Sequence, residues 1–239
     1  MQRLEIGKWL PVAGMTEVFI KHVKSQKPQP TEIDPTAHNI KYNSGLGYLP
    51  LSIDIPIDII RSEALAVVPY MIDLTPGDYD SHGWSNFSMF GVPLEDQGDW
   101  GHDRADSSMA WTPEALELMP RTVEYFDQVW PHKRFWRMRL LGLKPGGVIG
   151  VHNDHCAGME NINIGIDHPD QCEFYLEGSG RIPFANGKCF ALDAGRRHAV
   201  INNSDQLRLH LVIHQTDNEQ FEKLIVDSYK DYTKSLALV

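Results

Sequence analysis

The fold is decided by the stretch GKCFALDAGRRHAVINNSDQLRLHLVIH, which covers residues 187–214. Three short strands are expected within it, at 187–192, 198–201 and 207–214. The segments between them are rich in Gly, Asn and Asp, so the strands are expected to form antiparallel hairpins. In the last strand, polar and apolar residues alternate. Arg208 and His210 should therefore share one face, while the leucines occupy the other.

Similar runs continue towards the N-terminus. Four more strands are expected, at 135–143, 148–152, 161–166 and 173–176. Between the first two lies KPGG (144–147), a sequence typical of turns. Short strands at regular spacing favour an antiparallel sandwich or barrel. We therefore predict a mainly β fold with flanking helices, whose core is a double-stranded β-helix, the jelly roll of cupins.

Two helices are expected before these strands. One covers residues 55–70, and the other follows Thr112, an N-cap residue type, with Pro113 at the first helical position. In the second helix four apolar residues recur at helical spacing, namely Leu116, Met119, Val123 and Phe126. A chain of 239 residues is expected to form a single domain. We expect three parts, a helical and loop region at 1–132, the jelly-roll core at 133–214 and a C-terminal helix at 215–239.

The composition is that of an ordinary soluble globular protein, with 42% hydrophobic and 23% charged residues. The formal net charge of -10 argues against non-specific nucleic-acid binding, which depends on Lys and Arg contacting phosphate. Three scattered cysteines, Cys156, Cys172 and Cys189, indicate neither a disulfide framework nor a thiolate zinc site. The sequence has no signal-peptide pattern and no membrane-spanning run. We therefore expect a cytoplasmic protein that binds neither nucleic acid nor membrane.

A metal site is indicated by His152 and Asp154, which are two positions apart and so lie on the same face of an extended strand end. His198 lies in a segment that can run beside them. Two imidazoles and one carboxylate leave open positions on the ion, an arrangement diagnostic of non-haem Fe(II) oxygenases. The alternative is that His152 and Asp154 form a turn and His198 lies at the surface. His155 is a competing ligand, although it points the other way on a regular strand.

Arg208 indicates a second ligand. If its face of the strand lies inside the sheet, the charge needs a partner, because an unpaired buried charge is very costly. A guanidinium fork matches a carboxylate through two contacts, so the predicted ligand is a dicarboxylate cosubstrate. The alternative is an Arg on the solvent face of an edge strand.

Three segments carry a resemblance to a known family, namely LKPGGVIGVHND (143–154), NINIGI (161–166) and FANGKCFALDAGRRHAVINNSDQLRLHLVIH (184–214). They resemble the aspartyl/asparaginyl β-hydroxylase and proline cis-hydroxylase branch of the Fe(II)- and 2-oxoglutarate-dependent dioxygenases. The resemblance implies an enzyme that uses Fe(II), 2-oxoglutarate and O₂ and releases succinate and CO₂. It further implies hydroxylation of an unactivated C–H bond in an amino acid, or in an aspartyl, asparaginyl or prolyl residue.

The resemblance also implies roles for single residues. It makes His152, Asp154 and His198 the iron ligands, and it makes Arg208, beside His210, the anchor of the far carboxylate of 2-oxoglutarate. Animal aspartyl β-hydroxylases carry Gly where Asp154 stands, so this chain is more similar to the proline hydroxylases at that position. Asn161 and Asn163 stand where relatives often carry basic residues or His. We expect them to hydrogen-bond to the cosubstrate.

The substrate side is less clearly marked. Arg137 and Arg139 share strand parity, so they either face the site together and bind an acidic substrate group, or face solvent. For Trp84, core or lid packing is ranked ahead of substrate stacking. Asp193 either orients a metal ligand or forms a turn. The polar, Gly-rich segment 91–108 is predicted to be a mobile lid.

Two other classes of function compete with the oxygenase. A cupin-type hydrolase or isomerase would use the same three residues with Zn²⁺ or Mn²⁺, and would need neither Arg208 nor 2-oxoglutarate. A jelly-roll binding module would need no open metal position. The sequence does not distinguish a free amino acid from a protein substrate, and it leaves the oligomeric state open.

Overall fold

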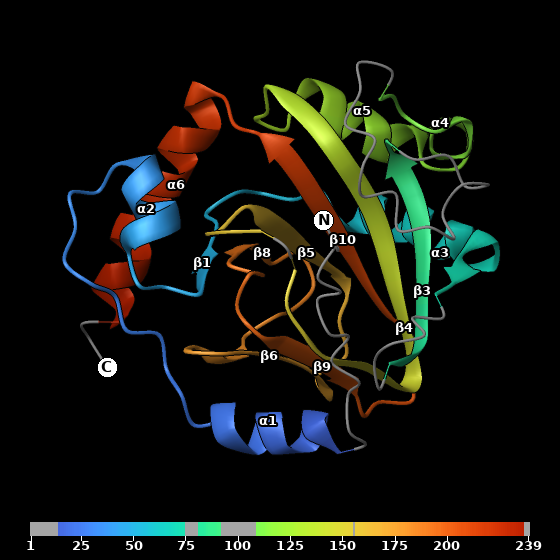
Figure 1. The fold of residues 1–239 in the computed structure, drawn as a ribbon. Helices are drawn as coiled ribbons and strands as arrows, with labels where there is room; N and C mark the ends of the chain where they lie inside the picture. Colours follow the sequence, from blue (N-terminus) through green and yellow to red (C-terminus); the bar gives the residue numbers. More distant parts are fainter. Residues whose placement is uncertain (1–13, 75–80, 92–108, 155, 237–239) are drawn as a thin grey trace, which may run out of the picture.

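The protein is a nearly closed barrel of antiparallel strands with helices on its outside (Figure 1). The computed structural model describes residues 14–74, 81–91, 109–154 and 156–236. The strands are β1 (Tyr48–Pro50), β2 (Ile72–Asp73), β3 (His82–Phe90), β4 (Arg134–His152), β5 (Asn161–Asp167), β6 (Cys172–Leu176), β7 (Gly180–Ile182), β8 (Cys189–Leu192), β9 (His198–Asn202) and β10 (Arg208–Thr216). The helices are α1 (Met15–Val23), α2 (Ala37–Asn43), α3 (Ile57–Val67), η1 (Val68–Tyr70), α4 (Pro113–Leu118), α5 (Pro120–Gln128) and α6 (Glu219–Leu236).

The strand order is β1-β8-β5-β10-β4-β9-β6-β7, with β3 added along β4 and β2 along β3. This arrangement confirms the predicted jelly roll with flanking helices. Strands β1, β2 and β3 come from before residue 133 and also belong to the sheet. Within the described part of the chain, no helix has the length and apolar character that crossing a bilayer requires.

The strand β4 differs from the prediction of two strands separated by a turn at 144–147. It is continuous, and its first part pairs with β10 while its last part pairs with β9. Gly146 takes a positive φ of 71°, which lets the strand bend without leaving the ladder. The Asn202 side chain secures the bend by donating to the carbonyls of Leu143 (2.9 Å) and Lys144 (3.1 Å). The turn-like sequence therefore forms a corner within one strand.

The second predicted helix is divided in two. Thr112 caps α4 as expected, because its side chain accepts a hydrogen bond from the Ala115 N–H at 3.2 Å. The helix then ends at Leu118, because Pro120 disfavours helical geometry in Met119, the residue before it. Met119, Val123 and Phe126 are buried as predicted, whereas Leu116 is exposed.

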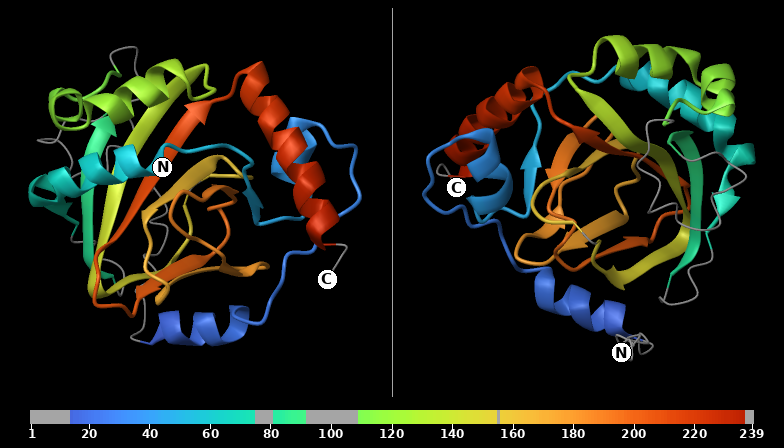
Figure 2. Two further views of the ribbon diagram at one scale, coloured as in Figure 1. Left: turned by 180° about the vertical axis from the view of Figure 1, so that it is seen from behind. Right: turned by 45° about the horizontal axis from the view of Figure 1, so that its top comes forward.

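The larger core lies between the outer face of the sheet and the helices (Figure 2). Leu209, Leu211 and Ile213 of β10 pack in this layer against residues of α3, α5 and α6. Each buried side chain of this kind contributes roughly 1.5–3 kcal/mol. A slip of one residue would move the alternate residues Arg208 and His210 into the apolar layer, so the pattern fixes the register.

A smaller apolar cluster fills part of the barrel interior and includes Trp84, Leu143, Phe174 and Phe184. Arg208 and His210 lie on this inner side, opposite the leucines of their strand, as the alternation predicts. Helix α1 closes the outside of β6 and β9, where Phe19 and Val23 contact Tyr175 and Ala199. The barrel interior is thus partly apolar and partly lined by polar and charged side chains.

Candidate metal centre

His152, Asp154 and His198 meet at one end of the barrel. His152 is the last residue of β4 and His198 the first of β9, and the two are direct partners in the ladder. Asp154 follows two residues after β4, where its N–H donates to the Ala194 carbonyl at 2.8 Å. One ligand atom from each of the three side chains lies within 4.8 Å of the others, as a shared metal ion requires.

Both imidazoles present the same nitrogen to this point. Nδ1 of His152 donates to the Gly150 carbonyl at 2.8 Å, and Nδ1 of His198 donates to the Arg196 carbonyl at 3.0 Å. A carbonyl only accepts, so the proton of a neutral ring is on Nδ1 in either position, and Nε2 is the nitrogen that can ligate a metal. Nε2 of His152 lies 3.7 Å from Oδ1 of Asp154. The donor set fits a divalent transition metal such as Fe(II).

The surroundings of His198 keep it neutral. Its ring stacks on Phe174, with ring centroids 5.5 Å apart and planes inclined by 12°. Burial lowers the pKa of His198 to about 4, and the neighbouring His152 acts in the same direction. A neutral imidazole is the form that ligates metals.

Asp193 acts on this site through a neighbour. Its Oδ2 accepts a hydrogen bond from Arg196 Nε at 2.8 Å, and Arg196 Nη2 also donates to the carbonyls of Gly45 and Leu46. The Arg196 carbonyl in turn accepts the hydrogen bond from His198 Nδ1. Asp193 therefore holds the loop that orients His198, without contacting that ring itself.

Arg208 is a buried cation with free hydrogen-bonding capacity. It is 2% exposed, and its Nη2 donates to His210 Nδ1 at 2.7 Å. Its Nε and Nη1 atoms have no hydrogen-bond partner among the described residues. Burial lowers the pKa of Arg208 to about 10, so it stays charged at neutral pH. A buried fork with two unpaired N–H-bearing atoms fits a carboxylate ligand.

Comparison with known families gives one match that covers most of the chain. Residues 56–217 match the model of the aspartyl/asparaginyl β-hydroxylase family. The chain belongs to this family. It is therefore an enzyme, a 2-oxoglutarate-dependent hydroxylase, and the matched segment contains His152, Asp154, His198 and Arg208.

No curated protein gives a significant match. Among solved structures, an oxidoreductase of the 2OG-Fe(II) oxygenase family from Burkholderia pseudomallei is 16% identical, covers 79% of this chain and 92% of its own, and has a TM-score of 0.46. A Pseudomonas putida prolyl-4-hydroxylase is 11% identical over 77% of this chain and 98% of its own, with a TM-score of 0.41. A Bordetella pertussis cupin domain is 18% identical over 36% of this chain and 84% of its own, with a TM-score of 0.28.

In this family member a row of polar side chains connects the carboxylate to the buried arginine. Asn161 Nδ2 donates to Asp154 Oδ2 at 3.3 Å, and Asn163 Nδ2 donates to Asn161 Oδ1 at 2.9 Å. Asn163 Oδ1 lies 3.2 Å from His210 Nδ1, the atom that accepts a hydrogen bond from Arg208 Nη2. Both amides are buried. Asn161 therefore orients the Asp154 carboxylate, and Asn163 holds Asn161 in place.

His168 joins this network and was missed by the sequence analysis. It follows β5 in the segment DHPD, which looks like an ordinary turn. Its Nδ1 lies 2.7 Å from His210 Nε2, and it is 8% exposed. No spacing rule connects residues 168 and 210. One indication of such a partner was present in the sequence. Alternation places His210 on the same face as Arg208, and if that face is buried, each ring nitrogen of His210 needs a polar partner.

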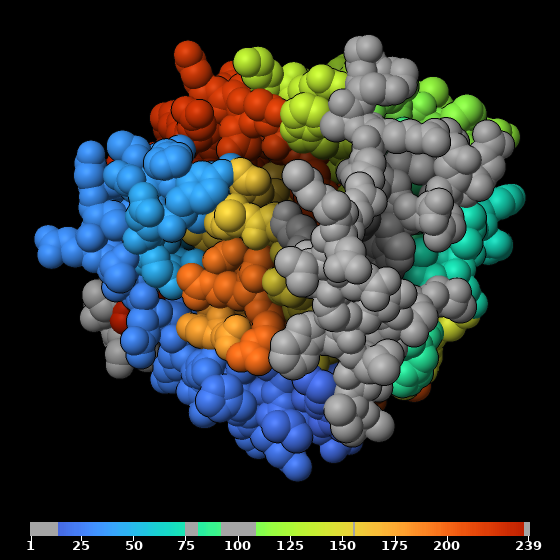
Figure 3. Space-filling model, in the orientation of Figure 1, coloured from blue at the N-terminus to red at the C-terminus, as the bar shows by residue number. Residues whose placement is uncertain are grey.

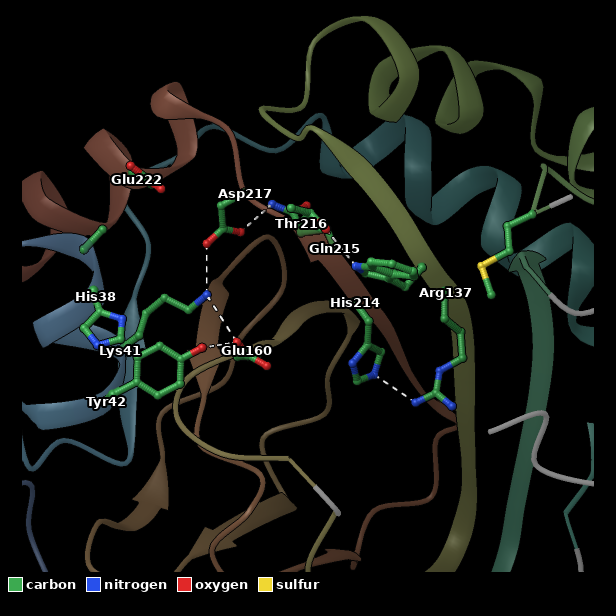
Figure 4. Close-up of a pocket in the computed structure, with 13 residues that line it drawn as sticks. His38, Lys41, Tyr42, Arg137, Glu160, His214, Gln215, Thr216, Asp217 and Glu222 are labelled. Atoms are coloured by element: carbon green, nitrogen blue, oxygen red, sulfur yellow. Dashed lines mark hydrogen bonds and ion pairs between the residues drawn. The ribbon is translucent and has the colours of Figure 1, made fainter. Parts of the chain in front are cut away.

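A cleft of about 630 Å³ opens between α2, β4 and β10 (Figure 4). One wall carries Lys41, Tyr42 and Glu160, and the other carries Arg137, whose Nη2 donates to His214 Nε2 at 3.0 Å. In the space-filling view, barrel residues coloured yellow and orange are visible beside α2 (Figure 3). The volume lies in the ordinary range of small-molecule sites.

The two predicted substrate arginines lie on the inner side of β4. Arg137 pairs with His214, and Arg139 pairs with Val212 on the same face. Burial lowers the pKa of Arg139 to about 9, and the charge of Arg137 adds to this effect. Burial also lowers the pKa of Arg137, while the nearby Asp154 carboxylate opposes that shift. Arg137 therefore connects the cleft with the metal centre.

Two predictions fall outside the part of the chain that the structure describes. They concern His155 as a competing ligand and the lid at 91–108, of which only Gly91 is described. Trp84 is described and lies in the cluster of the barrel interior, with its ring centroid 6.5 Å from that of His152. Packing is the role that these contacts give it.

Proposed function

We propose that the protein hydroxylates an unactivated C–H bond of a substrate that carries an anionic group, with Fe(II), 2-oxoglutarate and O₂ and with release of succinate and CO₂. The substrate is an amino acid, or an aspartyl, asparaginyl or prolyl residue. One observation carries the proposal. Two histidines, a carboxylate and a buried arginine with unpaired N–H groups face the interior of one barrel.

Each residue has a role in this proposal. His152 and His198 would hold Fe(II) through Nε2, and Asp154 would hold it through its carboxylate. When bound, iron and its cosubstrate supply the oxidising chemistry, which no side chain of the protein provides. Arg208 binds the far carboxylate of 2-oxoglutarate by a charge-assisted fork. Asn161 holds Oδ2 of Asp154 and so leaves Oδ1 directed towards His152.

The test of this function is coupled product formation. Purified protein is incubated with Fe(II), 2-oxoglutarate and a panel of free amino acids and peptides containing Asp, Asn or Pro. We expect succinate to form together with a substrate product heavier by one oxygen atom, and we expect chelation of the iron to stop both. Substrate conversion without succinate would instead indicate the cupin-type hydrolase or isomerase.

Arg137 and Arg139 are the reason for proposing that the substrate carries an anionic group. Arg137 is half-buried and Arg139 is buried, so the two neighbouring cations repel each other and lose part of their hydration, and an anionic ligand offsets both effects. We expect Arg137→Met to lower kcat/KM for the hydroxylated substrate by about ten- to a hundredfold, the range for losing a charged hydrogen bond. The affinity for 2-oxoglutarate should stay the same. Steady-state kinetics and calorimetry measure the two quantities.

Arg134→Met is the matched control. Arg134 lies at the start of the same strand, but it is exposed and stacks over the Trp136 ring at 4.6 Å. We expect this variant to keep wild-type kinetics. Equal kcat/KM values for Arg137→Met and Arg134→Met would rule out Arg137 as the substrate anchor.

A further inference from the structure

His168 is a buried histidine without a role in the proposed reaction. Its backbone N–H donates to Asn186 Oδ1 at 2.7 Å, which fixes the start of the segment between β5 and β6. Its ring packs beside Phe184 and His210, with centroid distances of 5.6 and 4.9 Å. The position of the ring is therefore set by both the backbone and packing.

The hydrogen bonds around His210 have a defined direction. His210 Nδ1 lies 2.7 Å from Arg208 Nη2, which can only donate, and 3.2 Å from Asn163 Oδ1, which can only accept. The contact with the charged guanidinium is the shorter and stronger of the two, so Nδ1 accepts from Arg208 and makes no hydrogen bond to Asn163. A neutral His210 then carries its proton on Nε2. This N–H lies 2.7 Å from His168 Nδ1, which accepts it. The direction of donation is thus Arg208 to His210 to His168.

The charge state of both rings agrees with this direction. Burial lowers the pKa of His168 to about 4, and Arg208 acts in the same sense. Burial also lowers the pKa of His210 well below its usual value, with Arg208 again contributing. Both rings are therefore neutral at pH 7. Each neutral ring then has one donor and one acceptor nitrogen, as the hydrogen bonds from Arg208 to His210 and from His210 to His168 require.

We infer that His168 is a positioning residue for the cosubstrate: it fixes the tautomer of His210, and His210 thereby holds the Arg208 guanidinium by Nη2. The N–H groups of Nε and Nη1 then remain available, and either of them, together with the second Nη2 N–H, can bind the carboxylate of 2-oxoglutarate. Without the acceptor on His168, the buried Nε2–H of His210 would be unsatisfied, which favours a rotated ring or the other tautomer. The other tautomer would direct an N–H against the guanidinium. The inference rests on the proposed function, because it takes 2-oxoglutarate as the ligand.

The test compares three substitutions by calorimetric titration of 2-oxoglutarate into Mn(II)-loaded protein, without turnover. His168→Leu removes the acceptor and should weaken 2-oxoglutarate binding about tenfold, the effect of one buried hydrogen bond. His168→Asn keeps an acceptor oxygen as many bonds from the backbone as Nδ1, so its Kd should stay within about threefold of wild type. His168→Gln places its amide one bond further out and should bind as weakly as His168→Leu. The Kd for Mn(II) alone should be the same in all variants.

His132→Leu is the control for removal of a packed imidazole. His132 stacks on Phe135 with centroids 3.8 Å apart. Its Nδ1 contacts the Trp130 carbonyl, so this hydrogen bond involves neither the metal-binding residues nor the side chains around Arg208. This variant should bind 2-oxoglutarate like the wild type. If His168→Leu does not fold, the difference between His168→Asn and His168→Gln decides.

Two results would overturn the inference. One is a wild-type Kd in both His168→Leu and His168→Gln. The other is equally weak binding by His168→Asn and His168→Gln, which would indicate that the ring acts by packing alone. Failure of the proposed function gives a different result, since the wild-type protein with Mn(II) would then not bind 2-oxoglutarate at all.

Discussion

His198→Ala should abolish iron-dependent turnover and remove stoichiometric Fe(II) binding. The described residues provide only three converging ligand groups, so no donor replaces the lost imidazole. Removing a group that merely orients a metal ligand costs about 10–100-fold in metal affinity or activity, and removing a ligand should cost more. Alanine at His152 or Asp154 should have the same effect. Metal content after dialysis and succinate formation are the two measurements.

His22→Ala is the control for this experiment, because His22 is an exposed residue of α1. It should bind one equivalent of Fe(II) and turn over normally. If His198→Ala retained full iron binding and activity, the metal would have to lie elsewhere in the chain, and the proposed centre would be wrong.

Arg208→Lys should weaken the binding of the cosubstrate 2-oxoglutarate by about one to two orders of magnitude, in both its Kd and its apparent KM. Lysine keeps the charge but loses the planar fork, and a charge-assisted hydrogen bond contributes roughly 1.5–3 kcal/mol. At about 1.4 kcal/mol for each factor of ten, this gives the expected range. Calorimetric titration of the cosubstrate into the Mn(II)-loaded protein measures the Kd directly.

Arg181→Lys is a matched control on another strand of the barrel. Arg181 lies on β7 with a half-exposed side chain, and it pairs with Glu173 at 3.3 Å. The same substitution there should leave 2-oxoglutarate binding unchanged. An unchanged Kd in Arg208→Lys would favour a metal-dependent hydrolase or isomerase, which has no use for a dicarboxylate anchor.

The sequence was sufficient where a short-range pattern determines the structure. The alternation in β10 predicted that Arg208 and His210 share the face opposite the leucines. In the structure the leucines pack against the helices, and Arg208 and His210 face the barrel interior. The spacing of His152 and Asp154 predicted a shared direction at a strand end. The family motifs then indicated that His198 should join them, and the register of β4 with β9 brings it there.

Other features depend on contacts between distant segments. The bend of β4 is secured by Asn202, about sixty residues further along the chain, so its sequence alone looks like a turn. His168 reaches His210 only because β5 lies beside β10. The cleft, likewise, is formed where α2 faces β10. Neither composition nor periodicity carries information about such pairings.

The bend of β4 also bears on how the protein can be engineered. Lys144, Pro145 and Gly146 are exposed, and an exposed Pro-Gly turn is the usual choice for inserting a tag or opening a chain for circular permutation. Here the residues on either side are already paired, Leu143 with Arg208 and Val148 with Ile201. An insertion at this point would uncouple the strand segment beside Arg208 from the segment that ends in His152. An exposed bend that looks suitable for insertion therefore connects the strand segment beside Arg208 to the segment that carries His152.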